Sequence, residues 1–94
     1  MATIHIGEEM EMIRCWQYPV RIQTRRNQYE FTVRLDWSDY DHWSHGRVSP
    51  SVVVDAVMRF MLTKQPPEEM SERFDCAKLR MLYPEMDEVL PGMF

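Results

Sequence analysis

Apolar and polar residues alternate along residues 16–37 in the pattern of a β-hairpin. The apolar positions are even-numbered in the first arm, as at Val20 and Ile22, and odd-numbered in the second, as at Phe31 and Val33. Strict alternation places one face of a strand against a core and the other in water. The sequence therefore predicts a hairpin over residues 16–37 with one apolar and one polar face.

The turn of this hairpin determines which residues of the two arms face each other. A turn centred on Arg26-Asn27 predicts three apolar cross-strand pairs: Val20 with Val33, Ile22 with Phe31, and Trp16 with Trp37. A slip by one residue would turn the whole apolar set toward solvent, so burial of one face strongly restricts the register. We therefore expect Trp16 and Trp37 in the core.

The residues before the hairpin predict a third strand. Residues 3–13 alternate weakly, and Gly7 interrupts them in the manner of a bulge. An isolated two-stranded hairpin is marginally stable in water, so this segment is expected to pair with one of its edges. Pro19 has no N–H to donate, which favours the first arm at an edge, or Pro19 at a strand start or bulge. The prediction is an antiparallel three-stranded sheet.

Two helices and a short helical segment are predicted in the C-terminal half. Ser49-Pro50 is a typical helix start, and apolar residues surround all but a narrow stripe of a helix over residues 50–64. Pro67 is expected to open an amphipathic helix that ends near Leu82, and the segment after Pro84 adds a turn or two. Residues 38–48 break the alternation, and a loop is expected there.

This order of elements predicts the fold class. Strands followed by helices are typical of an α+β fold, with two to three C-terminal helices packed on one face of the sheet. A chain of 94 residues, 45% of them hydrophobic, has the size and composition of one small globular domain spanning residues 1–94. Its longest apolar run is too short to span a membrane, and its first residues lack a targeting pattern. We therefore expect a cytoplasmic protein, with Cys15 and Cys76 as free thiols.

Residues 36–45 concentrate side chains that can bind metals. They are Asp36, Asp39, Asp41, His42 and His45. Their spacing matches neither a calcium-binding loop nor the helical zinc motif of metalloproteases, so no metal or other cofactor is predicted. The chain also has no nucleophile elbow and no glycine-rich phosphate loop. We therefore expect a protein that is not an enzyme.

Aromatic residues of the same segment favour protein binding. Tyr40 and Trp43, with His42 between them, have no place in the alternating pattern, and large amphipathic rings beside charged residues are enriched at interface hot spots. The alternative for Trp43 is a lid over the core. Met93 and Phe94 end an apolar tail that a small monomer has difficulty covering. These five residues predict a small interaction protein, an inhibitor, adaptor or accessory regulator, that binds a protein partner.

The apolar helix over residues 50–64 also predicts self-association. Its polar stripe is narrow for a helix on the surface of a monomer. The expectation is a homodimer that buries some of the following residues: Val52, Met58, Met61, Met93 and Phe94.

The polar face of the hairpin offers an alternative function. Positive charges concentrate there, although the chain as a whole carries a net charge of −4. A two-stranded ribbon can enter the DNA major groove, where arginines contact phosphates and guanine edges. The candidate nucleic-acid contacts are Arg21, Gln23, Arg25, Arg26 and Arg34. The acidic surroundings oppose the approach of phosphates, so nucleic-acid binding ranks second.

Overall fold

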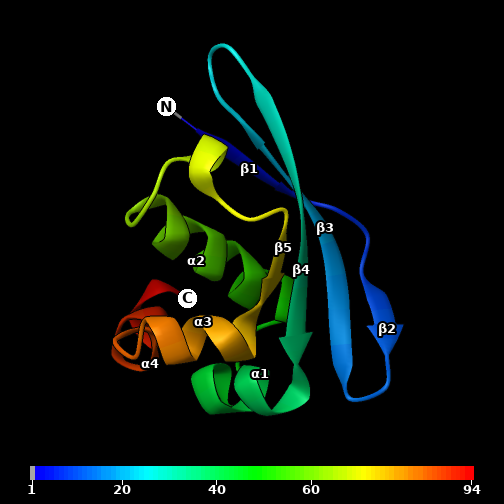
Figure 1. The fold of residues 1–94 in the computed structure, drawn as a ribbon. Helices are drawn as coiled ribbons and strands as arrows, with labels where there is room; N and C mark the ends of the chain where they lie inside the picture. Colours follow the sequence, from blue (N-terminus) through cyan, green and yellow to red (C-terminus); the bar gives the residue numbers. More distant parts are fainter. Residues whose placement is uncertain (1) are drawn as a thin grey trace.

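A computed structural model of the protein describes residues 2–94 (Figure 1). Its strands are β1 (Thr3–Ile6), β2 (Met10–Met12), β3 (Cys15–Gln23), β4 (Gln28–Asp36) and β5 (Arg73–Asp75). Its α-helices are α1 (Trp37–Ser44), α2 (Pro50–Leu62), α3 (Cys76–Leu82) and α4 (Met86–Val89). Two short 3-10 helices are η1 (Pro67–Glu69) and η2 (Leu90–Met93). The α+β class is therefore confirmed.

The sheet has five strands and mixed pairing. Its order is β1-β3-β4-β5, and β2 also pairs with β3 beyond the end of β1. All pairs are antiparallel except β4 with β5, which is parallel. The expectation of an antiparallel three-stranded sheet was therefore wrong in two respects. Residues 3–13 form two strands rather than one, and a further strand comes from the C-terminal half.

The β3–β4 hairpin has the predicted faces but not the predicted pairs. Arg25 and Arg26 form its tip, and the Thr24 N–H donates to the Asn27 carbonyl at 2.8 Å. Cross-strand pairing is therefore displaced by two residues from the prediction: Trp16 faces Leu35, Tyr18 faces Val33, and Val20 faces Phe31. Because the side-chain period of a strand is two residues, this displacement leaves the side chains of β3 and β4 on their predicted faces.

Pro19 lies within the central strand β3 rather than in an edge strand. The Gly7 N–H donates to the Pro19 carbonyl at 2.7 Å, so the backbone polar groups of Pro19 face the β1–β2 side of β3. The neighbouring outer strand is interrupted beside Pro19, between β1 and β2. The sheet therefore needs no N–H donor from Pro19 at this position. A Cβ on Gly7 would lie 2.6 Å from Pro19 Cγ, so only glycine allows this close approach.

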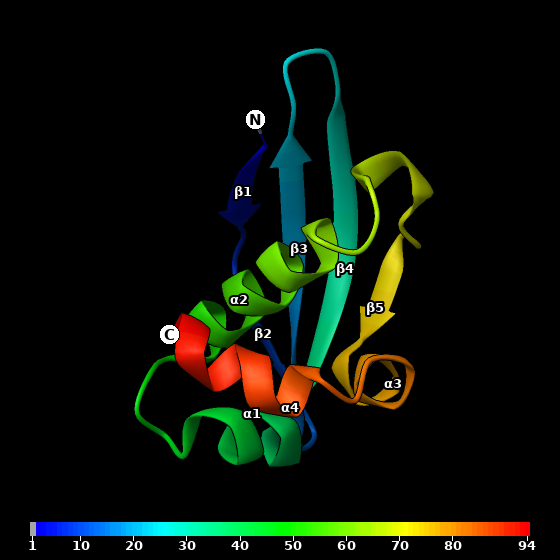
Figure 2. The same ribbon diagram turned by 90° about the vertical axis from the view of Figure 1, so that its left-hand side faces the viewer.

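The helices cover one face of the sheet, as the sequence predicts, and leave the other open (Figure 2). α2 lies across the covered face, where Val53 and Val57 pack with Ile22 and Val33 in a fully buried core. α2 begins at Pro50 after Ser49, as predicted, and ends at Leu62. Within residues 2–94, no helix combines the length and the apolar character that a membrane crossing demands.

Two segments have a different secondary structure from the prediction. Residues 37–44 form helix α1 directly after β4, where a loop was expected. Residues 67–82 form η1, β5 and α3 in place of one continuous helix. Phe74 of β5 is buried and its ring lies 5.8 Å from that of Phe31, so packing against β4 outweighs the helical pattern of the local sequence.

Candidate protein-binding surface

The structure exchanges the predicted roles of two tryptophans. Trp43, a predicted partner anchor, is completely buried, whereas Trp37, a predicted core residue, is 46% exposed. Both belong to α1, where Trp43 lies one turn after the buried Asp39 on the face that packs into the domain. Trp37 is the first residue of the helix and lies at its exposed end. Trp43 is therefore the lid over the core, and its prediction as an exposed contact was wrong.

A polar network surrounds the Trp43 ring and joins three helices. The indole Nε1–H of Trp43 donates to Asp87 Oδ1 at 2.8 Å. Arg80 donates to both carboxylate oxygens of Asp87, at 2.8 and 2.9 Å, and to Asp39 Oδ1 at 2.8 Å. The Arg80 guanidinium also lies 5.7 Å from the centre of the Trp43 ring, within the range of a cation–π contact. The network thus ties α1 to α3 and α4.

Two carboxylates share the single guanidinium of Arg80 in this network. The hydrogen bonds from Arg80, with that from Trp43, lower the pKa of Asp87 below its ordinary value against the opposing effect of burial. Asp39 is 3% exposed, and its Oδ2 has no hydrogen-bond partner among residues 2–94.

Burial raises the pKa of the nearby Cys76 thiol, so this buried cysteine stays protonated and unreactive.

The other four predicted partner contacts do not form one exposed surface. Tyr40 is half-buried, packs edge-on against Trp16 with ring centres 5.2 Å apart, and donates its hydroxyl to the Val48 carbonyl. His42 is exposed, with its Nε2 3.6 Å from Asp87 Oδ2. Met93 and Phe94 are half-buried and pack against the core.

The interior of the monomer accounts for the apolar character of α2. Met58 and Met61 are at most 1% exposed, and the C-terminal Met86 and Leu90 are fully buried in the same core. The sheet and the C-terminal segment cover this helix, so Met58 and Met61 cannot contribute to a homodimer interface. Val52 alone of the helix residues expected at that interface retains substantial exposure, at 36%.

The predicted nucleic-acid contacts are exposed on the open face of the sheet and at the hairpin tip. They are Arg21, Gln23, Arg25, Arg26 and Arg34. Arg21 faces Glu30 across the β3–β4 pair, and Arg34 forms an ion pair with Asp36 at 3.1 Å. The positive field of this face is therefore partly neutralised, and Arg25 and Arg26 carry most of what remains.

The exposed apolar surface with the largest side chains lies around the β2–β3 turn. Ile13 is 89% exposed, and Met10, Met12 and Trp37 are between 43% and 58% exposed. Ile13 and Trp37 line one hollow of about 470 Å³ together with Arg14, Arg34, Asp36 and Ser38. We call Met10, Met12, Ile13 and Trp37 the turn patch. Contiguous exposed apolar side chains mark interaction sites, and Ile13 and Trp37 share this hollow.

The turn that carries Ile13 is linked to the start of α1. Arg14 has a left-handed conformation with a φ of 59°, which a non-glycine residue adopts at some cost. Its carbonyl accepts the Trp37 N–H at 3.0 Å and so links the turn to the start of α1. The Trp37 ring packs on Trp16, with centres 6.2 Å apart. A backbone hydrogen bond and ring packing therefore link the part of the surface that carries Ile13 and Trp37 to the rest of the domain.

Sequence reasoning missed this surface, although one signal pointed to it. Met12 and Ile13 are adjacent apolar residues, and a single strand face cannot bury both. A turn between them and Cys15 would have explained the break in alternation.

Within residues 2–94, the structure contains no group of three or more His, Cys, Asp or Glu side chains arranged to hold a metal ion. Comparison with known protein families, with curated proteins and with solved structures finds no match to this chain.

Proposed function

We propose that this chain is a non-enzymatic interaction protein, an inhibitor, adaptor or accessory regulator, that binds a protein partner through the turn patch. The observation that carries the proposal is the exposure of Ile13 at 89% beside Trp37 at 46%, at a turn that is hydrogen-bonded to the start of α1. Burying a side chain of this size contributes about 1.5–3 kcal/mol. Tryptophan is also enriched among residues that dominate interface energies.

The proposal predicts that Ile13→Ser and Trp37→Ala each weaken partner binding by about tenfold or more. A photo-crosslinking residue at position 13 would first identify the partner in cells that contain the chain. The purified partner would then be titrated with each variant. Leu82→Ser is the matched control, because Leu82 is 70% exposed on α3, outside the turn patch. Equal affinity of the patch variants and the control would contradict the proposal.

If the partner of the turn patch is a second copy of the chain, the patch forms a homodimer interface. Sedimentation equilibrium at high protein concentration would then show a dimer that Ile13→Ser dissociates and Leu82→Ser does not. A monomer at all concentrations would remove the homodimer and leave a different protein as the partner.

The hairpin tip supports nucleic-acid binding as a second candidate function. The β3–β4 hairpin projects beyond the helices, and Arg25 and Arg26 are exposed at its end (Figure 2). Arg25→Glu should then abolish retention on duplex DNA at low salt, because contacts to phosphates dominate such binding. Lys78→Glu, at an exposed position on α3, changes the net charge equally and should have no effect. Absence of any wild-type retention at low salt would exclude this candidate.

A further inference from the structure

The outer edge of β4 is paired along only part of its length. Parallel pairing with β5 covers Thr32–Arg34, and the Thr32 N–H donates to the Glu72 carbonyl at 2.8 Å. Backbone polar groups alternate sides along a strand, so the N–H and C=O of Gln28 and Glu30 point to the same side as those of Thr32. Within residues 2–94, no strand pairs with this side of Gln28 or Glu30.

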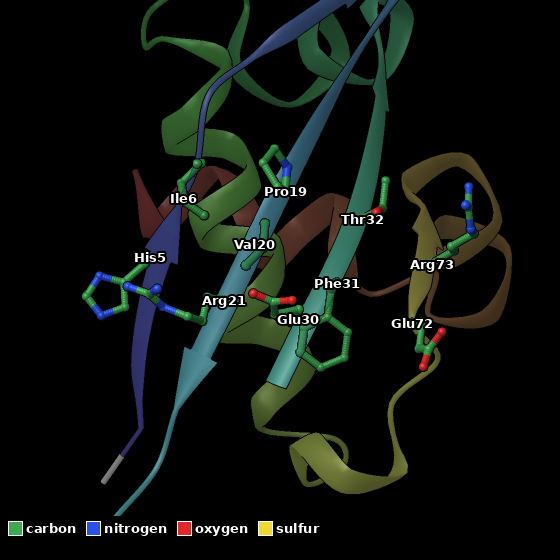
Figure 3. Close-up of a pocket in the computed structure, with 11 residues that line it drawn as sticks. His5, Ile6, Pro19, Val20, Arg21, Glu30, Phe31, Thr32, Glu72 and Arg73 are labelled. Atoms are coloured by element: carbon green, nitrogen blue, oxygen red, sulfur yellow. The ribbon is translucent and has the colours of Figure 1, made fainter. Parts of the chain in front are cut away.

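A groove lies along this unpaired edge. The segment that precedes Glu72, from η1 onward, lies away from β4. A hollow of about 530 Å³ separates this segment from β4. Phe31 and Met70, both at least nine-tenths buried, line it together with Gln28, Tyr29 and Pro67. Figure 3 shows the adjoining hollow, which shares Glu30 and Phe31 of β4 and Glu72 of the facing segment with this groove. The groove therefore combines an apolar interior with open backbone hydrogen-bonding groups.

The charge of the groove is negative. The side chains of Glu30, Glu68 and Glu72 line it, and no Lys, Arg or His does. None of these three carboxylates takes part in an ion pair among residues 2–94, although the Tyr29 hydroxyl donates to Glu68 Oε2 at 3.5 Å. Arg21 and Arg73 line the adjoining hollow on the open face of the sheet, which Glu30, Phe31 and Glu72 line as well, and Arg21 faces Glu30 across the β3–β4 pair.

We propose that this groove binds an extended segment of another polypeptide that carries lysine or arginine and adds to β4 as a strand. Strand addition to a free sheet edge is a recurring mode of peptide recognition, in which backbone hydrogen bonds supply affinity and alternate side chains supply specificity. Gln28 and Glu30 each offer one N–H and one C=O to such a segment. This surface is separate from the turn patch, and the proposal does not depend on the function proposed above.

The alternation of side chains along the added strand specifies its sequence pattern. Side chains on one face of the new strand would lie beside Glu30 on the open face of the sheet, where Arg21 balances part of the Glu30 charge. The preference of the groove for a cation therefore rests on Glu68 and Glu72 together with Glu30. Side chains on the other face would lie toward Phe31 and Met70, where an apolar side chain is favoured. The occupant is therefore an alternating basic and apolar segment of about three paired residues, roughly 10 Å long.

A synthetic peptide tests this directly. The probe is a fluorescein-labelled Lys-Val-Lys-Val-Lys peptide, blocked at both ends, and its matched control is Glu-Val-Glu-Val-Glu. Fluorescence anisotropy at about 0.15 M salt should show binding of the lysine peptide alone, because this salt screens attraction between charges more than about 8 Å apart and leaves mainly the close contacts inside the groove. Glu68→Lys and Glu72→Lys should each weaken its binding by about fivefold or more. Glu88→Lys, on α4 outside the groove, should leave binding unchanged although the net charge changes equally.

Backbone pairing provides the second readout. N-methylation of the peptide amides on one side of its strand should abolish binding, and N-methylation on the other side should preserve it. Amide hydrogen exchange at Gln28 and Glu30 should slow by about tenfold or more when the lysine peptide is present. The proposal is overturned if the lysine peptide fails to bind at millimolar concentration. It is equally overturned if Glu88→Lys weakens binding as much as Glu72→Lys, or if these two amides gain no protection.

Discussion

Trp43→Ala is expected to lower the free energy of unfolding by about 3–5 kcal/mol, whereas Trp37→Ala should lower it by about 1 kcal/mol or less. Trp43 is fully buried among core residues, so its removal leaves a large cavity that the helices cannot close. It also removes the hydrogen bond to Asp87. Trp37 is 46% exposed and loses mainly its packing on Trp16.

Urea denaturation followed by circular dichroism measures both variants on one scale. The Trp43 variant should show a much lower midpoint with an unchanged slope, which indicates loss of stability rather than a change in compactness. Similar midpoints for the two variants would contradict the placement of Trp43 inside the domain and Trp37 on the turn patch.

The sequence predicted these two tryptophans the wrong way round for a specific physical reason. Strand alternation continued through Trp37, and nothing in the pattern indicates that β4 ends at Asp36 and that a helix begins immediately. Once α1 begins at Trp37, the helical period rather than the strand period decides burial, and Asp39 and Trp43 share the inner face. Because a strand was predicted where helix α1 begins, Trp37 was assigned to the core and Trp43 to the surface.

The hairpin shows which features of a sheet a sequence can specify. Alternation predicted both faces correctly, because the burial of Val20, Ile22 and Val33 requires them on one side. It could not distinguish registers that differ by two residues, since both keep the same faces. The turn at Arg25-Arg26 decides between them, and neither residue is a characteristic turn former.

Long-range packing explains what the sequence could not predict at the two candidate surfaces. β5 is three residues long and exists because Phe74 packs on Phe31, far away in sequence. The groove along β4 depends on where that short strand begins. The turn patch depends on the turn at Ile13 and Arg14, which the weak alternation of residues 3–13 concealed. The predicted arginine face, by contrast, is exposed as expected, because it follows from the hairpin faces alone.

Arg80→Met is expected to lower the free energy of unfolding at neutral pH by about 3 kcal/mol, near the lower end for a broken buried ion pair. Asp39, at 3% exposure, would then retain a buried carboxylate without its one hydrogen-bonding partner. Asp87 is more exposed, so solvent screens part of its loss. Arg80→Lys keeps the charge but loses the bidentate contact to Asp87. We therefore expect an intermediate decrease in the free energy of unfolding.

The pH dependence of this loss distinguishes an ionic role of Arg80 from simple packing. In the folded wild type the pKa of Asp87 lies below its ordinary value, so Asp87 contributes stability above a pH of about 4. That contribution disappears as pH falls through the lowered pKa and the carboxyl becomes protonated. The stability gap between wild type and Arg80→Met should therefore be full at pH 7 and narrow below pH of about 4. Urea denaturation across this range measures the gap, and a gap of constant size at all pH values would show that Arg80 acts through its packing alone.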